Sequence, residues 1–276
     1  MKISFVGAGK VGTAFGKYIS RCYDVTSYYS KTDQSAQEAS AYVGCRWSSD
    51  LKQIIESSDV VFITTGDNVI KEVADTISQI EVSFSSKLFI HMSGALTSDE
   101  LISLRDKGAR TSSLHPLQTF SSIDKAVEDL SNAYFSVEGD ESAIPLVEAL
   151  GNSYFVLSKE QKTKYHLSAC IFSNYLVTLM NFGTKILNDI GIESDDGMKA
   201  MKPLIDATLS NIYMKGTELS LTGPIKRGDT QTLNKHMSEL EGLDLEVYQL
   251  LGKMTTDRLI MDDNKKSILD ALWRRL

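Results

Sequence analysis

A glycine-rich segment near the N-terminus has the spacing of a phosphate-binding turn. The sequence GAGKVG at residues 7–12 follows a short apolar run and precedes a predicted helix. In such a motif Gly7 makes a tight turn, Gly9 lets the backbone approach a pyrophosphate, and Gly12 lets the helix pack closely on the strand. The N–H groups at the start of the helix favour an anion. The alternative is a glycine-rich turn without a ligand. The residues predicted to contact a dinucleotide here are Gly7, Gly9, Lys10, Val11 and Gly12.

The residues after the second predicted strand indicate which dinucleotide would bind. An NAD site has an Asp or Glu there, about 20 residues beyond the glycines, which accepts a hydrogen bond from the ribose 2′-hydroxyl. This chain has Ser30 and Lys31 instead. A hydroxyl and a cation can hold a 2′-phosphate that a carboxylate would repel. The sequence therefore favours NADP(H) over NAD(H), unless Lys31 is an ordinary surface lysine.

Polar residues also follow three later predicted strands, and open α/β sheets bind ligands at the carboxyl ends of their strands. Thr64, Thr65 and Asp67 follow one strand and could line the ribose, although Asp67 could equally cap the next helix. Ser93 follows the next strand, and we expect it near the nicotinamide. His115 ends the third and is a candidate proton donor, or else a structural histidine.

A row of polar side chains lies within the sequence KYHLSACIFSNYL at 164–176. His166, Cys170 and Asn174 are spaced by four residues and so share one face of a helix. Polar groups on a face that is otherwise buried are costly unless they line a cavity or find partners. We therefore expect His166 to donate a proton and Asn174 to hold substrate. The alternative is a core cysteine flanked by two side chains that the backbone or a second subunit satisfies.

The segment LTGPIKRGDT at 221–230 predicts a loop between two helices. Its cations, Lys226 and Arg227, suit a carboxylate or phosphate group of a substrate, because guanidinium binds such anions through two parallel hydrogen bonds. Asp229 could cap the following helix.

Two patterns divide the chain. Residues 1–152 alternate β-rich apolar runs with helical stretches, which predicts a doubly wound, mostly parallel Rossmann sheet, an α/β fold. From residue 153 the strand pattern ends, and residues 153–276 predict an all-helical domain for substrate binding and dimerisation. Its first element is one long helix over 159–190. The predicted strands are 3–7, 25–30, 60–65, 88–93, 110–116 and 133–139.

Composition excludes several classes of protein. The chain has 276 residues and a formal charge of −7, which argues against nucleic acid as a partner. Cys22, Cys45 and Cys170 are widely spaced, which favours reduced thiols over a disulfide framework or a metal site. Glycines interrupt the N-terminal apolar run too early for a signal peptide, and no segment has the ~20 apolar residues of a membrane span. We therefore expect a cytoplasmic protein that contacts no membrane.

Over nearly its whole length the chain resembles Rossmann-type reductases of the β-hydroxyacid dehydrogenase and pyrroline-5-carboxylate reductase kind, in the branch with a C-terminal helical domain of unknown function. The resemblance implies an NADP-dependent oxidoreductase that forms a homodimer through its helices. The motifs that carry it are GAGKVG, HMSG at 91–94, LHPLQTF at 114–120, YHLSACIFSNYL at 165–176 and LTGPIKRGD at 221–229.

One departure bears on the chemistry. The β-hydroxyacid dehydrogenases use a lysine followed four residues later by asparagine; Asn174 fits the asparagine, but Cys170 stands where the lysine would be. The nearest ionisable groups on that face are His166 and Lys162. Pyrroline-5-carboxylate reductases work without that lysine. The resemblance therefore implies hydride transfer to or from a small carbonyl, imine or hydroxyacid compound. The alternatives are a non-catalytic NADP(H)-binding sensor and a deazaflavin-linked reductase.

Overall fold

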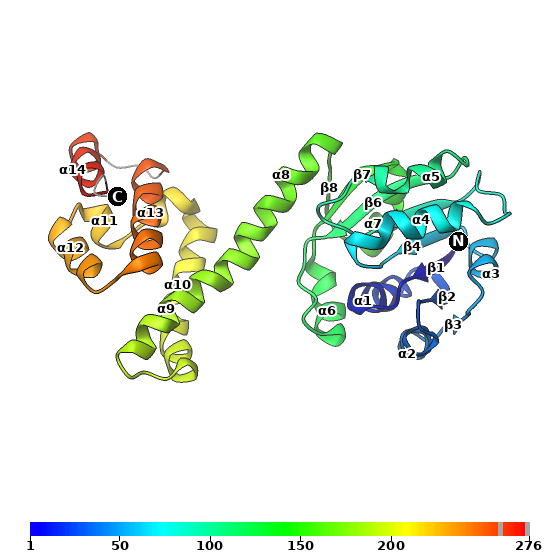
Figure 1. Ribbon diagram of the computed structural model, residues 1–276, viewed down its shortest axis with the longest axis horizontal. Helices are drawn as coiled ribbons and strands as arrows, with labels where there is room; N and C mark the ends of the chain where they lie inside the picture. The colour runs from blue at the N-terminus through cyan, green and yellow to red at the C-terminus, as the bar shows by residue number, and fades with distance from the viewer. Residues whose placement is uncertain (259–261, 274–276) are drawn as a thin grey trace. The chain divides into compact units, whose positions relative to one another are not determined.

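The computed structural model describes residues 1–258 and 262–273 (Figure 1). By its internal contacts the chain divides into two compact units, Met1–Asn174 and Tyr175–Leu276. The first unit therefore includes a strand and a helix beyond residue 152, where the sequence pattern changes.

The first unit is built on one eight-stranded sheet in the order β3-β2-β1-β4-β5-β6-β7-β8. Only the β6–β7 pair is antiparallel, which confirms the predicted mostly parallel Rossmann sheet. The strands are β1 (Lys2–Val6), β2 (Asp24–Tyr29), β3 (Arg46–Trp47), β4 (Val60–Ile63), β5 (Leu88–His91), β6 (Arg110–Pro116), β7 (Phe135–Gly139) and β8 (Tyr154–Val156). The expectation that strands end before residue 153 is wrong, because β8 pairs with β7. This strand has the sequence YFV, which is apolar but only three residues long, so the run is too short to predict a strand.

Helices pack against both faces of the sheet, because alternate residues of each strand point to opposite faces. In β4, Val60 and Phe62 belong to one buried cluster and Val61 and Ile63 to another. The first cluster includes residues of α1 (Lys10–Ile19), α2 (Asp33–Val43), α6 (Ile123–Asp129) and α7 (Ile144–Leu150). The second includes residues of α3 (Leu51–Glu56), α4 (Ile70–Ser78) and α5 (Ile102–Arg105).

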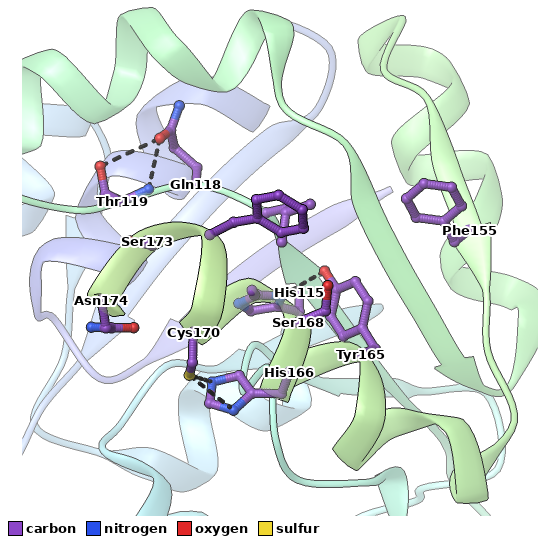
Figure 2. A pocket seen from close by; sticks show the side chains of 13 residues that line it. His115, Gln118, Thr119, Phe155, Tyr165, His166, Ser168, Cys170, Ser173 and Asn174 are labelled. Atoms are coloured by element: carbon purple, nitrogen blue, oxygen red, sulfur yellow. Dashed lines mark hydrogen bonds between the residues drawn. The ribbon is translucent and has the colours of Figure 1, made fainter. Parts of the chain in front are cut away.

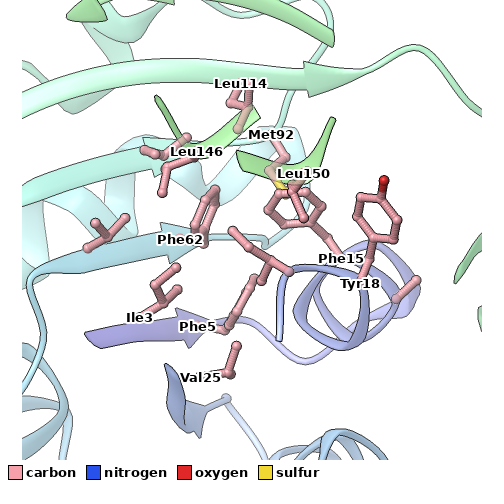
Figure 3. Close-up of a cluster of buried hydrophobic side chains, with 14 of the residues drawn as sticks. Ile3, Phe5, Phe15, Tyr18, Val25, Phe62, Met92, Leu114, Leu146 and Leu150 are labelled. Atoms are coloured by element: carbon pink, nitrogen blue, oxygen red, sulfur yellow. The ribbon is translucent and has the colours of Figure 1, made fainter. Parts of the chain in front are cut away.

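The first cluster is centred on aromatic rings (Figure 3). Phe5 stacks on Tyr28 and on Phe62, with ring centroids 4.9 and 5.2 Å apart. Phe15 of α1 meets Phe62 edge-on at 5.1 Å. These contacts fix α1, and with it the glycine-rich turn, against the middle of the sheet.

Helical structure runs from Lys159 to Asp189, close to the predicted long helix. It consists of α8 (Lys159–Cys170), a π-helical turn (Ile171–Tyr175) and α9 (Leu176–Asp189). The sequence analysis did not predict the π-turn. Because a π-turn holds more residues than an α-turn, it shifts the phase of the side chains that follow it.

The second unit is helical throughout its described residues, which confirms the predicted helical domain. After α9 its helices are α10 (Ser194–Ser220), α11 (Gly223–Arg227), α12 (Thr230–Ser238), α13 (Gly242–Arg258) and α14 (Asp263–Trp273). A small core joins α12 and α14 through Leu233 and Trp273, whose indole donates to Thr256 Oγ1 at 2.9 Å. The predicted loop at 221–230 is wrong in part, because α11 forms within it, with Pro224 in its first turn. None of the helices in residues 1–258 and 262–273 could cross a membrane.

Candidate active site

Four predicted site residues stand where parallel strands end. Gly7, Thr64 and Ser93 follow β1, β4 and β5, respectively. His115 is the next-to-last residue of β6. These four strands run parallel, so their carboxyl ends lie on one edge of the sheet. That edge is where an open α/β sheet binds its ligands.

The glycine-rich turn has the geometry that its three glycines permit. Gly7 has φ +110°, and a Cβ there would stand 2.7 Å from the carbonyl carbon of Thr64. A Cβ on Gly12 would stand 2.3 Å from Thr64 Oγ1, which donates to the Gly7 carbonyl at 2.7 Å. At Gly9, by contrast, no described atom lies within 4 Å of such a Cβ. Gly9 is the N-cap of α1, and no described side chain caps this end. The helix start is therefore open to an anion.

A cavity of about 580 Å³ lies beside this turn. The hydroxyl of Thr65 is buried there without a hydrogen-bond partner among the described residues. A buried hydroxyl without a partner is costly unless a ligand supplies one, so the residues present fit the ribose and phosphates of a dinucleotide. The predicted residues that line this cavity are Gly7, Gly9, Ser30, Lys31, Thr64 and Thr65.

Three other residues of the turn have different surroundings. The ammonium of Lys10 donates to the Ser121 carbonyl at 2.7 Å. Val11 packs against the first cluster, and Gly12 lies against Thr64. Any contribution of Lys10 and Val11 to phosphate binding would therefore come from their backbone N–H groups.

Asp67 and Ser93 are brought together by the structure. Ser93 Oγ donates to Asp67 Oδ2 at 2.7 Å and accepts from the backbone N–H groups of Ala95 and Leu96. Asp67 makes no cap of the helical turn that begins there. The pair instead ties the segment after β4 to the segment after β5.

A second cavity, of about 500 Å³, lies between the end of β6 and α8; we call it the histidine pocket (Figure 2). The predicted row of His166, Cys170 and Asn174 lines it in full, although Asn174 lies within the π-turn that follows Cys170. Cys170 Sγ lies 3.7 Å from Nδ1 and 3.9 Å from Nε2 of His166. Six of its lining residues are His115, Tyr165, His166, Cys170, Phe172 and Asn174.

The two histidines of the pocket meet over Gly94. A Cβ on Gly94 would stand 2.7 Å from His166 Cδ2 and 2.8 Å from His115 Nε2. His115 Nδ1 shares a hydrogen bond of 3.0 Å with the hydroxyl of Tyr165. Burial, aided by the nearby positive charge of Lys162, lowers the pKa of His115 to about 3. His115 is therefore neutral near pH 7 and makes a poor source of a proton.

His91 is a structural residue that the sequence analysis did not single out. Its Nδ1 accepts the N–H of Ser93 at 3.2 Å, and its Nε2 donates to the Thr97 carbonyl at 2.9 Å. Both bonds require the neutral ring with its proton on Nε2. Burial accordingly lowers the pKa of His91 to about 4. The ring fixes the backbone at Ser93.

Lys162 is buried at 0% exposure, and the sequence analysis gave it only a minor place. Its Nζ donates to Ser113 Oγ at 2.7 Å, and Ser113 in turn donates to the Ser93 carbonyl at 3.2 Å. Burial lowers the pKa of Lys162 to about 8, although the charges of Glu138 and Asp67 oppose this change. The signal was present in the spacing, because Lys162 lies four residues before His166.

We expect Lys162 to make stability depend on pH above neutrality. The folded chain binds fewer protons than the unfolded chain between the folded pKa of about 8 and the ordinary value of 10.5, so stability rises with pH across that window. Relative to Lys162→Met, the wild type should gain about 2 to 3 kcal/mol from pH 8 to pH 10.5. Urea unfolding of both proteins measures this. Lys164→Met, at an exposed position of α8, is the control. A constant difference across the window would contradict the burial argument.

Lys226 and Arg227 lie in α11, within the second unit. Arg227 pairs with Asp229 at 3.7 Å. Asp229 also caps α12 by accepting from the N–H and hydroxyl of Thr232, as the sequence suggested. An anion-binding role for this segment stays a prediction.

Comparison with protein families gives two matches. Residues 1–116 match the Rossmann-like domain, and residues 133–255 match a domain of unknown function (DUF2520). The chain thus joins a Rossmann-like domain to this C-terminal domain, which confirms the resemblance that the motifs indicated. No curated protein sequence matches the chain.

Solved structures with the same fold cover nearly the whole chain. Protein TM1727 from Thermotoga maritima is 26% identical, with a TM-score of 0.71 over 98% of this chain and 99% of that one. A proposed NADP oxidoreductase from Bacteroides fragilis is 22% identical, with a TM-score of 0.73 over 93% and 98%. A pyrroline-5-carboxylate reductase from Coxiella burnetii is 14% identical, with a TM-score of 0.60 over 99% and 96%. Imine reductases and a reductive aminase also match. These likenesses establish the fold.

Proposed function

We propose that the protein is an NADP(H)-dependent oxidoreductase that transfers a hydride to or from a small carbonyl, imine or hydroxyacid compound. The observation that carries the proposal is the open start of α1 beside a cavity that contains the buried, unpartnered hydroxyl of Thr65. The histidine pocket lies at the same edge of the sheet, and the Asp67–Ser93 bond joins the segments between them. Solved relatives of this fold include a reductive aminase in complex with NADPH and an imine reductase in complex with NADP⁺.

Residues of the glycine-rich turn would hold the diphosphate on the N–H groups of α1, and Thr64 and Thr65 would face the ribose. A bound nicotinamide supplies the hydride, and the protein must position the substrate and manage the proton. We assign the proton to His166, because burial keeps His115 neutral and Tyr165 holds its Nδ1. Asn174, which also lines the histidine pocket, would bind the substrate.

The cofactor preference gives a direct test. Lys31 is exposed at the rim of the cavity and follows β2, where it would meet a 2′-phosphate. Lys31→Glu should weaken NADPH binding by about 10- to 100-fold, because the change replaces an attractive charge with a repulsive one. NADH binding should be unchanged or improved. Titration calorimetry with both dinucleotides measures this, with Lys71→Glu on α4 as a matched change of charge. Equal losses for both dinucleotides would argue against a 2′-phosphate at Lys31.

The proposal also includes a homodimer formed through the helical unit. Large apolar side chains on and beside α9 and α10 are at least 64% exposed, and soluble monomers rarely leave a large contiguous apolar surface uncovered. A second copy of the chain is the occupant that we propose. These side chains are Val177, Ile190, Leu204, Tyr213, Met214 and Leu219.

Two charges on α10 should dissociate such a dimer. Tyr213 and Met214 are 83% and 73% exposed, so the double variant Tyr213→Glu, Met214→Glu should fold. Light scattering should show its mass fall from twice the chain mass to the 30.5 kDa of one chain. Ile102→Glu in the first unit is the control and should stay dimeric. A wild type that is already monomeric at micromolar concentration would contradict the dimer.

The experiment that tests the whole function is a titration with NADPH, followed by a panel of carbonyl and imine compounds monitored at the nicotinamide absorbance. An enzyme should bind NADPH and oxidise it with part of the panel. Binding without turnover of any compound would favour the sensor, and no binding of either dinucleotide at millimolar concentration would end the proposal.

As the cysteine pattern predicts, we expect the protein to act in the cytoplasm.

A further inference from the structure

The histidine pocket offers a substrate mostly apolar and neutral surfaces. Among the described residues that line it, none is Asp, Glu, Lys or Arg. Leu117, Phe155 and Phe172 are apolar, and Phe172 is 76% exposed. At about 500 Å³ the pocket falls within the ~300 to 1,000 Å³ of small-molecule sites.

The charges near the pocket are directed elsewhere. The ammonium of Lys162 donates a hydrogen bond to Ser113. The negative charges of Glu138 and Asp67 also favour the charged form of Lys162. Burial keeps His115 neutral near pH 7. A carboxylate that entered this pocket would lose its hydration, which is costly. Among the described lining residues only the imidazole of His166 could offer it a positive charge, and the proposed function gives that proton to the reacting carbonyl or imine.

The hydrogen-bonding groups suit a neutral acceptor. A neutral imidazole has one donor and one acceptor nitrogen, and His115 Nδ1 is already paired with the Tyr165 hydroxyl. If Tyr165 donates to Nδ1, the Nε2–H of His115 is left to donate beside Gly94, where His166 also lies. A carbonyl oxygen or an imine nitrogen can accept such a bond without carrying a full charge.

From these three features we propose that the substrate of this site is an uncharged ketone, aldehyde or imine with an apolar or aromatic group in the histidine pocket, and not a carboxylate. The inference rests on the proposed function and narrows it. It disfavours hydroxyacids, which the sequence left open. Phe172 and Phe155 would contact the apolar group.

A matched pair of ketones tests this. Benzylacetone and levulinate carry the same methyl ketone and differ only in a phenyl group or a carboxylate at the far end. Calorimetry with NADP⁺-saturated protein measures binding without turnover. Benzylacetone should bind about 10- to 100-fold more tightly, because the phenyl ring is buried and the carboxylate is desolvated. Turnover with NADPH, alone and with methylamine to supply the imine, should follow the same order.

Variants of Phe172 test whether the preference for benzylacetone arises in the histidine pocket. Phe172→Ala should weaken benzylacetone binding about tenfold, whereas Ile102→Ala, which removes an exposed side chain outside the pocket, should not. Phe172→Arg should improve levulinate binding. Levulinate that binds the wild type as well as benzylacetone, or through Lys226 and Arg227 as shown by their Gln variants, would overturn the inference.

The outcomes separate the two proposals. Absence of NADPH binding defeats the proposed function, while the ketone comparison on the unliganded protein still decides the preference of the pocket. Binding of NADPH with no binding of benzylacetone up to millimolar concentration defeats the inference alone.

Discussion

Gly9→Glu should weaken dinucleotide binding by two to three orders of magnitude, about 10²- to 10³-fold, and leave the fold intact. The N-cap position faces open space, so the new side chain meets no described atom near its Cβ. Its carboxylate would occupy the uncapped N-terminus of α1, accept the N–H groups meant for a phosphate and repel the diphosphate. Loss of several charge-assisted hydrogen bonds is worth about 3 to 4 kcal/mol, or a weakening of NADPH binding by about 10²- to 10³-fold.

The stability of this variant should move in the opposite direction. An acid in the first turn favours the helix dipole by about 0.3 to 1 kcal/mol, so the melting temperature should be equal or slightly higher. Calorimetry and thermal unfolding measure the two effects side by side. Gln37→Glu, an equal change of charge on the exposed side of α2, is the control. NADPH binding that survives Gly9→Glu would show that the diphosphate does not lie on this turn.

The central strands could be predicted because they are buried on both faces. A strand such as β4 is a continuous run of apolar residues, VVFI, and that run is visible in the sequence. The edge strand β3 has two exposed residues, and β8 has three residues that are at most half-buried. These strands pair with β2 and β7, but runs of two and three residues are too short for a sequence pattern to predict a strand.

The glycine-rich turn could also be predicted from the sequence, because its conformational requirements are local. A positive φ at Gly7 and the close approach of Gly12 to Thr64 select glycine by themselves. The hydrogen bond of Asp67 could not be predicted, because its partner Ser93 lies 26 residues away and follows a different strand. Only the order of strands in the sheet brings the two together.

The same distinction explains the buried polar groups. The spacing of His166 and Cys170 on α8 is local and was predicted, as was the place of Asn174 in the same cavity. The burial of Lys162 follows from the packing of α8 on the sheet, which puts its ammonium against Ser113, 49 residues earlier. A lysine in a polar stretch of helix is ordinarily solvated, so the residue type alone did not predict that Lys162 is buried.

His166→Ala should lower turnover by about 10²- to 10⁴-fold if this side chain supplies the proton. Histidine is the side chain that most often transfers protons in enzymes, and His166 lines the pocket next to Gly94. The variant should still bind NADPH as the wild type does, since His166 does not line the cavity at the glycine-rich turn. Because His166 is only half-buried, its loss should cost little stability.

Two matched variants distinguish proton transfer from packing. Cys170→Ser keeps the contact beside His166 and should retain most of the activity. His115→Phe replaces an imidazole that burial holds neutral with a ring that has no hydrogen-bonding nitrogen, so it should raise KM through lost substrate contacts more than it lowers kcat. Stopped-flow measurement of NADPH oxidation gives both constants. If His115→Phe lost turnover by about 10²- to 10⁴-fold and His166→Ala kept it, the proton would have to come through His115 and Tyr165, and the assignment of the two imidazoles would be reversed.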